Sequence, residues 1–176
     1  FLGPRNNDGP LEPFAFAEQE QALAVRLGVN RFVEGWLSTY ALGVERRVKV
    51  FGQHNDRATQ LNTDTRYGVG TTEYMRAHGG WALTLECGQH ADPHAPDVAY
   101  AAICNTLAHL GLSDAPAPEA LPASACEMLA LYEVIDKMHA DDHFVRPFAS
   151  FDAVRQGEPI GMRHDGTPVL ASALAV

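Results

Sequence analysis

A short apolar run between two helical patterns constrains the fold of this chain most strongly. Residues 81–86, WALTLE, follow a helical pattern at 71–80 and precede a turn and a longer amphipathic pattern at 96–111. Continuous apolar runs are typical of parallel strands that are buried on both faces. A helix, a short buried strand, a turn and a second helix in this order are typical of an α/β domain, and we predict that fold class. The apolar residues of the longer helix are Val98, Ile103, Leu107 and Leu110.

Local signals place the ends of these two helices. A threonine caps the start of the helix at 71–80, Glu73 lies in its first turn, and the Gly79–Gly80 pair ends it. Gly111 ends the helix at 96–111 in the same way. Both helices are therefore expected to flank the predicted strand closely.

The chain before residue 71 carries weaker patterns. Residues 15–28 have a helical apolar spacing that stops at Gly28. Residues 31–40 mix β-branched and aromatic residues and predict a short strand, and residues 44–52, which alternate around valines, predict another strand or part of a hairpin. Residues 54–68 are polar and rich in turn formers, so we expect a long surface loop there.

The composition changes at residues 113–124, SDAPAPEALPAS, which are typical of a Pro/Ala linker. After this segment, short apolar runs are separated by Gly, Pro and Asp-Gly, a pattern typical of strands and turns. We therefore predict an α/β domain at 1–112 and a small all-β module at 125–176.

Charge and cysteine content restrict the partners and the location. The net charge is −9, which disfavours binding to a phosphate backbone, so we expect no nucleic-acid partner. Apolar runs fall short of the roughly 18 residues that span a bilayer, so we expect no membrane partner either. The three cysteines lack CxxC spacing and favour a reducing compartment. We expect a cytoplasmic protein with a small-molecule partner, and homo-oligomer formation is left open.

Glu86 and Arg76 are candidate functional residues. Strand alternation places Leu83 and Leu85 on one face and Glu86 on the other, at the end of the predicted strand. Ligands bind outside the carboxyl ends of strands in open α/β sheets, where a carboxylate can act as a general base. Arg76, ten residues earlier, can bind a carboxylate through its planar fork. The structural alternatives are a solvent-facing or paired glutamate and a surface arginine.

The histidines predict no zinc site within the chain. None of the eight histidines has a glutamate three residues later, so the HxxE zinc motif does not occur. His90 and His94 are four residues apart, but Pro93 interrupts a helix between them. His139 and His143 have the same spacing in the predicted β-module.

Residues 70–93, GTTEYMRAHGGWALTLECGQHADP, closely resemble the C-terminal part of the catalytic domain in the succinylglutamate desuccinylase/aspartoacylase family. These proteins are zinc-dependent amidohydrolases related to the zinc carboxypeptidases. The resemblance extends over residues 1–112, and residues 125–176 are similar to the family's C-terminal β-domain. It implies the remainder of a zinc-carboxypeptidase-like mixed sheet with flanking helices, followed by a small all-β module.

The resemblance also implies residue roles. Glu86 matches the glutamate that activates the zinc-bound water and protonates the leaving amine, and Arg76 matches an arginine that binds the substrate carboxylate. Tyr74 lies near a position where the family carries a substrate-contacting tyrosine, although the spacing differs by two residues. The family's zinc ligands, an HxxE pair and a later histidine, are expected upstream of Phe1.

The expected activity is therefore zinc-dependent hydrolysis of the amide bond in a small N-acyl amino acid or a similar carboxylate-bearing amide. A carboxypeptidase acting on peptides would use the same chemistry. The alternative is a binding or assembly module that lacks the zinc-ligand half, which the absence of HxxE from this sequence favours.

Overall fold

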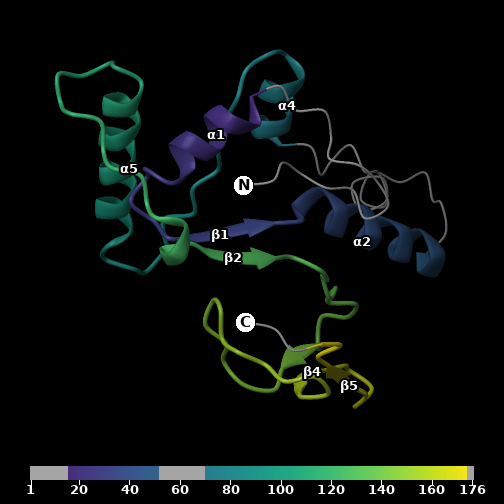
Figure 1. Ribbon diagram of the computed structural model, residues 1–176. Helices are drawn as coiled ribbons and strands as arrows, with labels where there is room; N and C mark the ends of the chain where they lie inside the picture. The colour runs from purple at the N-terminus through teal and green to yellow at the C-terminus, as the bar shows by residue number, and fades with distance from the viewer. Residues whose placement is uncertain (1–15, 52–69, 174–176) are drawn as a thin grey trace. The chain divides into compact units, whose positions relative to one another are not determined.

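The computed structural model describes residues 16–51 and 70–173, and the chain divides into two compact units, Phe1–Val134 and Ile135–Val176. Helices and strands are mixed, and the described residues contain two small sheets, one of two strands and one of three (Figure 1). This mixture agrees with the predicted α/β class at a coarse level. The predicted zinc-carboxypeptidase-like sheet remains a prediction.

The first unit contains helices and one parallel pair of strands. β1 and β2 pair in parallel, with Arg31 opposite Glu127 and Glu34 opposite Ala130. The elements, in chain order, are α1 (Ala17–Ala24), β1 (Arg31–Glu34), α2 (Trp36–Phe51), α4 (Thr71–Ala77), α5 (Ala95–His109), a short 3-10 helix (Ala123–Ala125) and β2 (Glu127–Ala130).

Three predicted helices and one predicted strand are present. α1 lies within the predicted range 15–28, α4 within 71–80, and α5 covers most of 96–111. β1 occupies the start of 31–40. The long loop predicted at 54–68 lies outside the described residues.

The strand or hairpin predicted at 44–52 is wrong, because residues 44–51 continue α2 and residue 52 lies outside the described residues. Val44 and Val48 are four residues apart, a spacing that one face of a helix explains as well as a strand does. Thr39 and Val44 are buried, so the helix packs through this face. The valines therefore reflect a helical period rather than a strand.

The strand predicted at 81–86 is also wrong, since neither sheet of the described residues includes this segment. Its predicted alternation is nevertheless present: Trp81, Leu83 and Leu85 pack against the buried core of the first unit, whereas Thr84 and Glu86 are exposed. The backbone N–H of Ala82 donates to a side chain instead of a neighbouring strand. Side-chain packing therefore holds this segment in place, and it forms no backbone hydrogen bonds of a β-sheet with the described strands. The core residues that it contacts are Leu23, Leu27 and Ala102.

The helix α5 buries different residues from those that its sequence predicts. Ala102 and Ala108 are buried, while Ile103 is 58% exposed and Leu107 and Leu110 are also exposed. Ala102 belongs to the same buried cluster as Leu23 and Leu27, whereas the larger Ile103 and Leu107 of α5 are exposed.

The two units divide between Val134 and Ile135, not within residues 113–124. The Leu121 N–H donates to the Val25 carbonyl at 2.7 Å, and β2 pairs with β1, so residues 121–130 belong to the first unit. A Pro/Ala composition therefore occurs inside a unit here, rather than between two.

The second unit is a small antiparallel sheet. Its strands, in the order β3-β4-β5, are β3 (His143–Phe144), β4 (Pro159–Met162) and β5 (Pro168–Leu170). The Asp-Gly turn predicted in HDGTP joins β4 to β5, where the Arg163 N–H donates to the Thr167 carbonyl at 2.8 Å.

Across residues 16–51 and 70–173, no helix combines the length and the apolar character that crossing a bilayer requires.

Candidate functional site

Arg76 lies in the last turn of α4 and is paired with Glu20 of α1. Its Nε donates to Glu20 Oε1 at 2.9 Å, and its Nη2 donates to Glu20 Oε2 at 2.6 Å. Glu20 is fully buried, and the Arg76 side chain is 13% exposed. This is the two-pronged geometry through which arginine binds carboxylates most strongly.

The Glu20 carboxylate also holds the segment that precedes Glu86. The backbone N–H of Ala82 donates to Glu20 Oε1 at 2.8 Å. A buried carboxylate is costly unless charge and hydrogen bonds compensate it, and here one guanidinium and one backbone N–H do so. Glu20 therefore joins α1, α4 and residues 81–86 at one point.

The start of α4 differs in detail from the sequence prediction. Gly70, rather than a threonine, precedes the first helical turn, and its N–H donates to Glu73 Oε2 at 2.9 Å. The Thr72 hydroxyl donates to the same oxygen at 2.8 Å. Glu73 lies in the first turn as predicted, where a carboxylate satisfies N–H groups that lack a helical partner.

Glu86 lies at the exposed end of the anchored segment 81–86. Within the described ranges, its carboxylate makes no hydrogen bond or ion pair. The structure does not pair Glu86 with Arg76, whose fork is turned to Glu20. Chemically, Glu86 is a solvent-accessible proton acceptor on a backbone that neighbouring apolar side chains hold in place.

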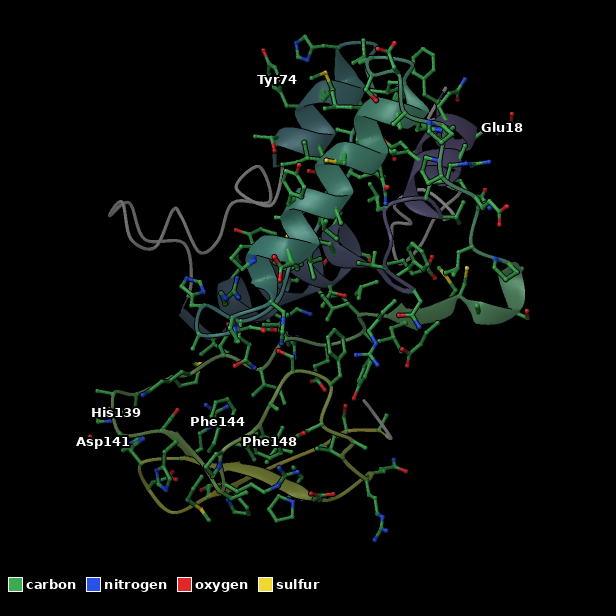
Figure 2. All side chains as sticks on the ribbon, turned by 90° about the vertical axis from the view of Figure 1, so that its left-hand side faces the viewer. Glu18, Tyr74, His139, Asp141, Phe144 and Phe148 are labelled. Atoms are coloured by element: carbon green, nitrogen blue, oxygen red, sulfur yellow. The ribbon has the colours of Figure 1, made fainter. Side chains whose placement is uncertain are left out.

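Tyr74 lies on the outer side of α4 and is 64% exposed (Figure 2). Its ring stacks on His78, with ring centroids 4.0 Å apart, and its carbonyl lies 2.7 Å from His78 Nδ1. Of the three predicted site residues, Tyr74 and Arg76 share α4, and Glu86 lies on the segment that follows this helix.

No three His, Cys, Asp or Glu side chains among the described residues lie where they could share a metal ion. His90 and His94 are exposed, and His94 Nδ1 is 3.8 Å from Asp97. This part of the chain thus supplies no zinc ligand set of its own.

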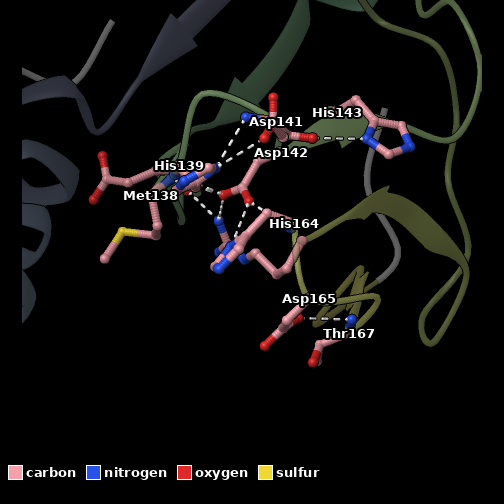
Figure 3. A network of polar contacts seen from close by, with 10 residues as sticks. Met138, His139, Asp141, Asp142, His143, His164, Asp165 and Thr167 are labelled. Carbon is pink, nitrogen blue, oxygen red and sulfur yellow. Dashed lines mark hydrogen bonds and ion pairs between the residues drawn. The ribbon is translucent and has the colours of Figure 1, made fainter.

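A second polar network, centred on Asp142, was not predicted from the sequence. The Asp142 side chain is 6% exposed and accepts a hydrogen bond from Arg163 Nη1 at 2.8 Å (Figure 3). It also accepts from the backbone N–H groups of Met138 at 2.9 Å, His139 at 3.2 Å and His164 at 2.9 Å. The Arg163 guanidinium holds the pKa of this carboxyl well below its usual range.

An aspartate side chain often accepts hydrogen bonds from backbone N–H groups nearby in the sequence, and such a bond stabilises a turn. Asp142 does this with residues three and four positions before it, which is the only part of the network that a local sequence pattern indicates. The stacked rings of His139 and His164, 4.2 Å between centroids, lie beside it. Through Asp142, the network links residues 138–142 to Arg163 and His164, at the turn between β4 and β5. We interpret its role as structural.

No protein-family model, curated protein or solved structure matches this chain. The resemblance to the succinylglutamate desuccinylase/aspartoacylase family therefore remains a prediction from the sequence, chiefly from residues 70–93.

Proposed function

We propose that this chain supplies the general base, Glu86, for hydrolysis of the amide bond in a small N-acyl amino acid or a similar carboxylate-bearing amide. The observation that carries this proposal is the placement of Glu86. Leu83 and Leu85 anchor the preceding backbone in the core, and the carboxylate that follows is exposed and without a partner among the described residues.

The chemistry requires a carboxylate that can both take and return a proton. Glu86 accepts a proton from the attacking water and delivers it to the leaving nitrogen. A carboxylate already engaged by an arginine, as Glu20 is, serves this role poorly, so the two glutamates have different tasks.

The reaction proposed here is that of a zinc-dependent amidohydrolase, in which bound zinc supplies Lewis-acid polarisation of the amide. The described residues do not form a set that fits zinc. We therefore propose metal ligands outside residues 16–51 and 70–173, and the proton transfers above are assigned to Glu86 alone.

Arg76 and Tyr74 are the proposed substrate contacts. Glu20 occupies the Nε/Nη2 edge of the Arg76 guanidinium, and Glu73 Oε1 lies 3.8 Å from Nη1, so a substrate carboxylate has to compete with these two glutamates for Arg76. Tyr74 is two residues before Arg76 on α4, so its exposed side chain lies on a different face of the helix and would contact the substrate only from that side.

The test is the variant Glu86→Gln in the full gene product, assayed with N-succinyl and N-acetyl amino acids. We expect kcat to fall by about 10²–10⁴-fold while KM changes little, because the side chain keeps its size and loses only proton transfer. The matched control is Glu45→Gln, an exposed carboxylate on α2. Turnover near that of the parent protein in Glu86→Gln would overturn the assignment. Dipeptide substrates in the same panel distinguish a carboxypeptidase.

A second candidate is a binding or assembly module without catalytic activity. The observation that favours it is the occupied fork of Arg76, since a buried Glu20–Arg76 pair is sufficient as a structural contact. Metal analysis of the full gene product separates the two candidates: one zinc per chain supports the hydrolase, and no zinc supports the module.

A further inference from the structure

A pocket of about 690 Å³ lies in the first unit between α1 and the paired strands β1 and β2. We name it the α1–strand pocket. Glu18 and Ala22, four residues apart on one face of α1, line it together with Val25, which directly follows the helix. Its volume is in the range of small-molecule sites, roughly 300–1,000 Å³.

The opposite wall of the α1–strand pocket comes from one face of the sheet. Phe32 and Glu34 alternate along β1 and therefore point to the same side, and Met128 is the residue of β2 that pairs with Phe32. Phe32 is buried, while Met128 is half exposed, so the wall offers an apolar surface that a ligand can reach. Leu121 adds a further apolar side chain to the wall, and its backbone N–H donates to the Val25 carbonyl.

Two carboxylates face this apolar surface from opposite walls. Glu18 lies on α1 (Figure 2), and Glu34 lies at the carboxyl end of β1, the end at which parallel sheets bind ligands. Neither carboxylate has a hydrogen-bond or ion-pair partner among the described residues. Both carboxylates are therefore accessible to a cationic ligand without displacing a described partner.

The nearest basic side chains in sequence, Arg26 and Arg31, are not among the residues that line the pocket. Arg31 donates to Glu127 at 2.6 Å, and Arg26 donates to the Ala22 carbonyl at 2.6 Å. Arg31 also lies on the face of β1 opposite to Phe32 and Glu34. The charge of the α1–strand pocket is thus negative, and its walls are otherwise mostly apolar.

We infer that the α1–strand pocket binds a small primary amine with an apolar body. The ammonium group lies between Glu18 and Glu34, and the apolar body packs against Phe32 and Met128. Charge complementarity selects the amine, since a carboxylate of the same shape would meet two like charges and a neutral analogue would gain no ion pair.

The experiment titrates the protein with 2-phenylethylamine, 2-phenylethanol and 3-phenylpropanoate and follows backbone amide NMR shifts. We expect the amine to bind roughly tenfold or more tightly than the alcohol, with shifts centred on Phe32 and Met128, and the carboxylate not to bind. Glu34→Gln and Glu18→Gln are each expected to weaken amine binding by a similar factor. Glu45→Gln, which does not line the pocket, is expected to leave binding unchanged.

Equal affinity for the amine and the alcohol would overturn the inference and leave only an apolar crevice. Unchanged amine affinity in Glu18→Gln would do the same. Glu18 is exposed, so this variant keeps the fold and remains decisive if Glu34→Gln does not fold. Hydrolytic activity does not enter these measurements, so their failure and the failure of the Glu86 proposal are separate outcomes.

Discussion

Glu20 is a buried carboxylate whose three hydrogen bonds join α1, α4 and residues 81–86. In Glu20→Ala, the Arg76 guanidinium and the Ala82 N–H lose their acceptor inside the packed unit. We expect the free energy of unfolding to fall by about 3–5 kcal/mol, the usual consequence of removing one partner of a buried ion pair. Urea unfolding followed by circular dichroism measures this change.

The control for Glu20 is Glu18→Ala, an exposed position on the same helix. Its free energy of unfolding should stay within about 0.5 kcal/mol of the parent value. Equal losses in both variants would show that the Glu20–Arg76 pair contributes no more than an exposed residue does.

Asp142 makes the stability of the second unit depend on acid pH. Its folded pKa is lowered, chiefly by Arg163, so the unfolded chain takes up the proton first as the pH falls. The stabilisation is fully present above the ordinary aspartate pKa of about 3.9 and is lost as the pH falls from there toward the folded pKa. Asp142→Asn removes this contribution at neutral pH.

Thermal unfolding at several pH values, followed by NMR signals of residues 143–170, tests the role of Asp142. We expect Asp142→Asn to be less stable than the parent at neutral pH and the two to converge in acid. Asp141→Asn, at a neighbouring exposed position, should keep the pH dependence of the parent. A parent-like acid slope in Asp142→Asn would contradict the assignment.

The sequence predicts which way a single side chain faces only where a regular spacing of apolar residues determines it. The alternation of 81–86 predicts Leu83 and Leu85 on one face and Glu86 on the other, and the structure packs the two leucines against the core and exposes Glu86. Arg76 forms its two shortest hydrogen bonds with Glu20, 56 residues earlier, and no local pattern indicates a pair at that separation. The sequence therefore indicates on which face Glu86 lies, but it does not indicate that Glu20 binds Arg76.

At the scale of elements, local signals succeeded where helix ends are marked. α1, α4 and α5 are each followed by glycine positions at or near the predicted stops. Strand assignments failed at 44–52, where valines at helical spacing resemble alternation, and at 81–86, where a strand needs a neighbour. Strand formation depends on a partner that the strand's own sequence does not specify.

The turn from β1 into α2 requires glycine for two reasons. Gly35 has φ +88°, and a β-carbon there would lie 2.5 Å from the Leu131 carbonyl oxygen. Gly79 has a similar φ, +81°, but a β-carbon added there would have no atom within 4 Å. Comparing the two glycines separates backbone strain from steric overlap.

Gly79→Ala is expected to lower the free energy of unfolding by roughly 1–2 kcal/mol, the cost of a left-handed alanine. Gly35→Ala is expected to cost about 1–3 kcal/mol more, because the methyl group also overlaps Leu131. Chemical denaturation of both variants measures the difference. Equal losses would mean that the approach of Gly35 to Leu131 is not close in solution.

At the scale of the whole molecule, composition located a Pro/Ala segment but not the division of the chain. Residues 113–124 are a Pro/Ala segment, yet β2 returns after it to pair with β1, and Arg31 binds Glu127 across 96 residues. Amino-acid composition indicates how polar and how stiff a segment is. The boundary between two compact units depends instead on contacts between segments that are distant in the sequence.

The last prediction compares chains that end at residue 134 and at residue 124. The shorter chain lacks β2, and it also loses the bond from Thr39 Oγ1 to the Leu131 carbonyl and the ion pair between Arg46 and Glu133. At about 1 kcal/mol for each lost hydrogen bond, the shorter chain should be less stable by several kcal/mol.

Thermal melting by circular dichroism tests this comparison. We expect the chain ending at residue 134 to melt cooperatively, because it keeps every contact of the first unit, Phe1–Val134. The chain ending at residue 124 should melt at a lower temperature or without cooperativity, because β1 has lost its partner strand and Phe32 part of its cover. Identical melting of the two chains would place the boundary back within residues 113–124 and would make the β1–β2 pair dispensable for folding.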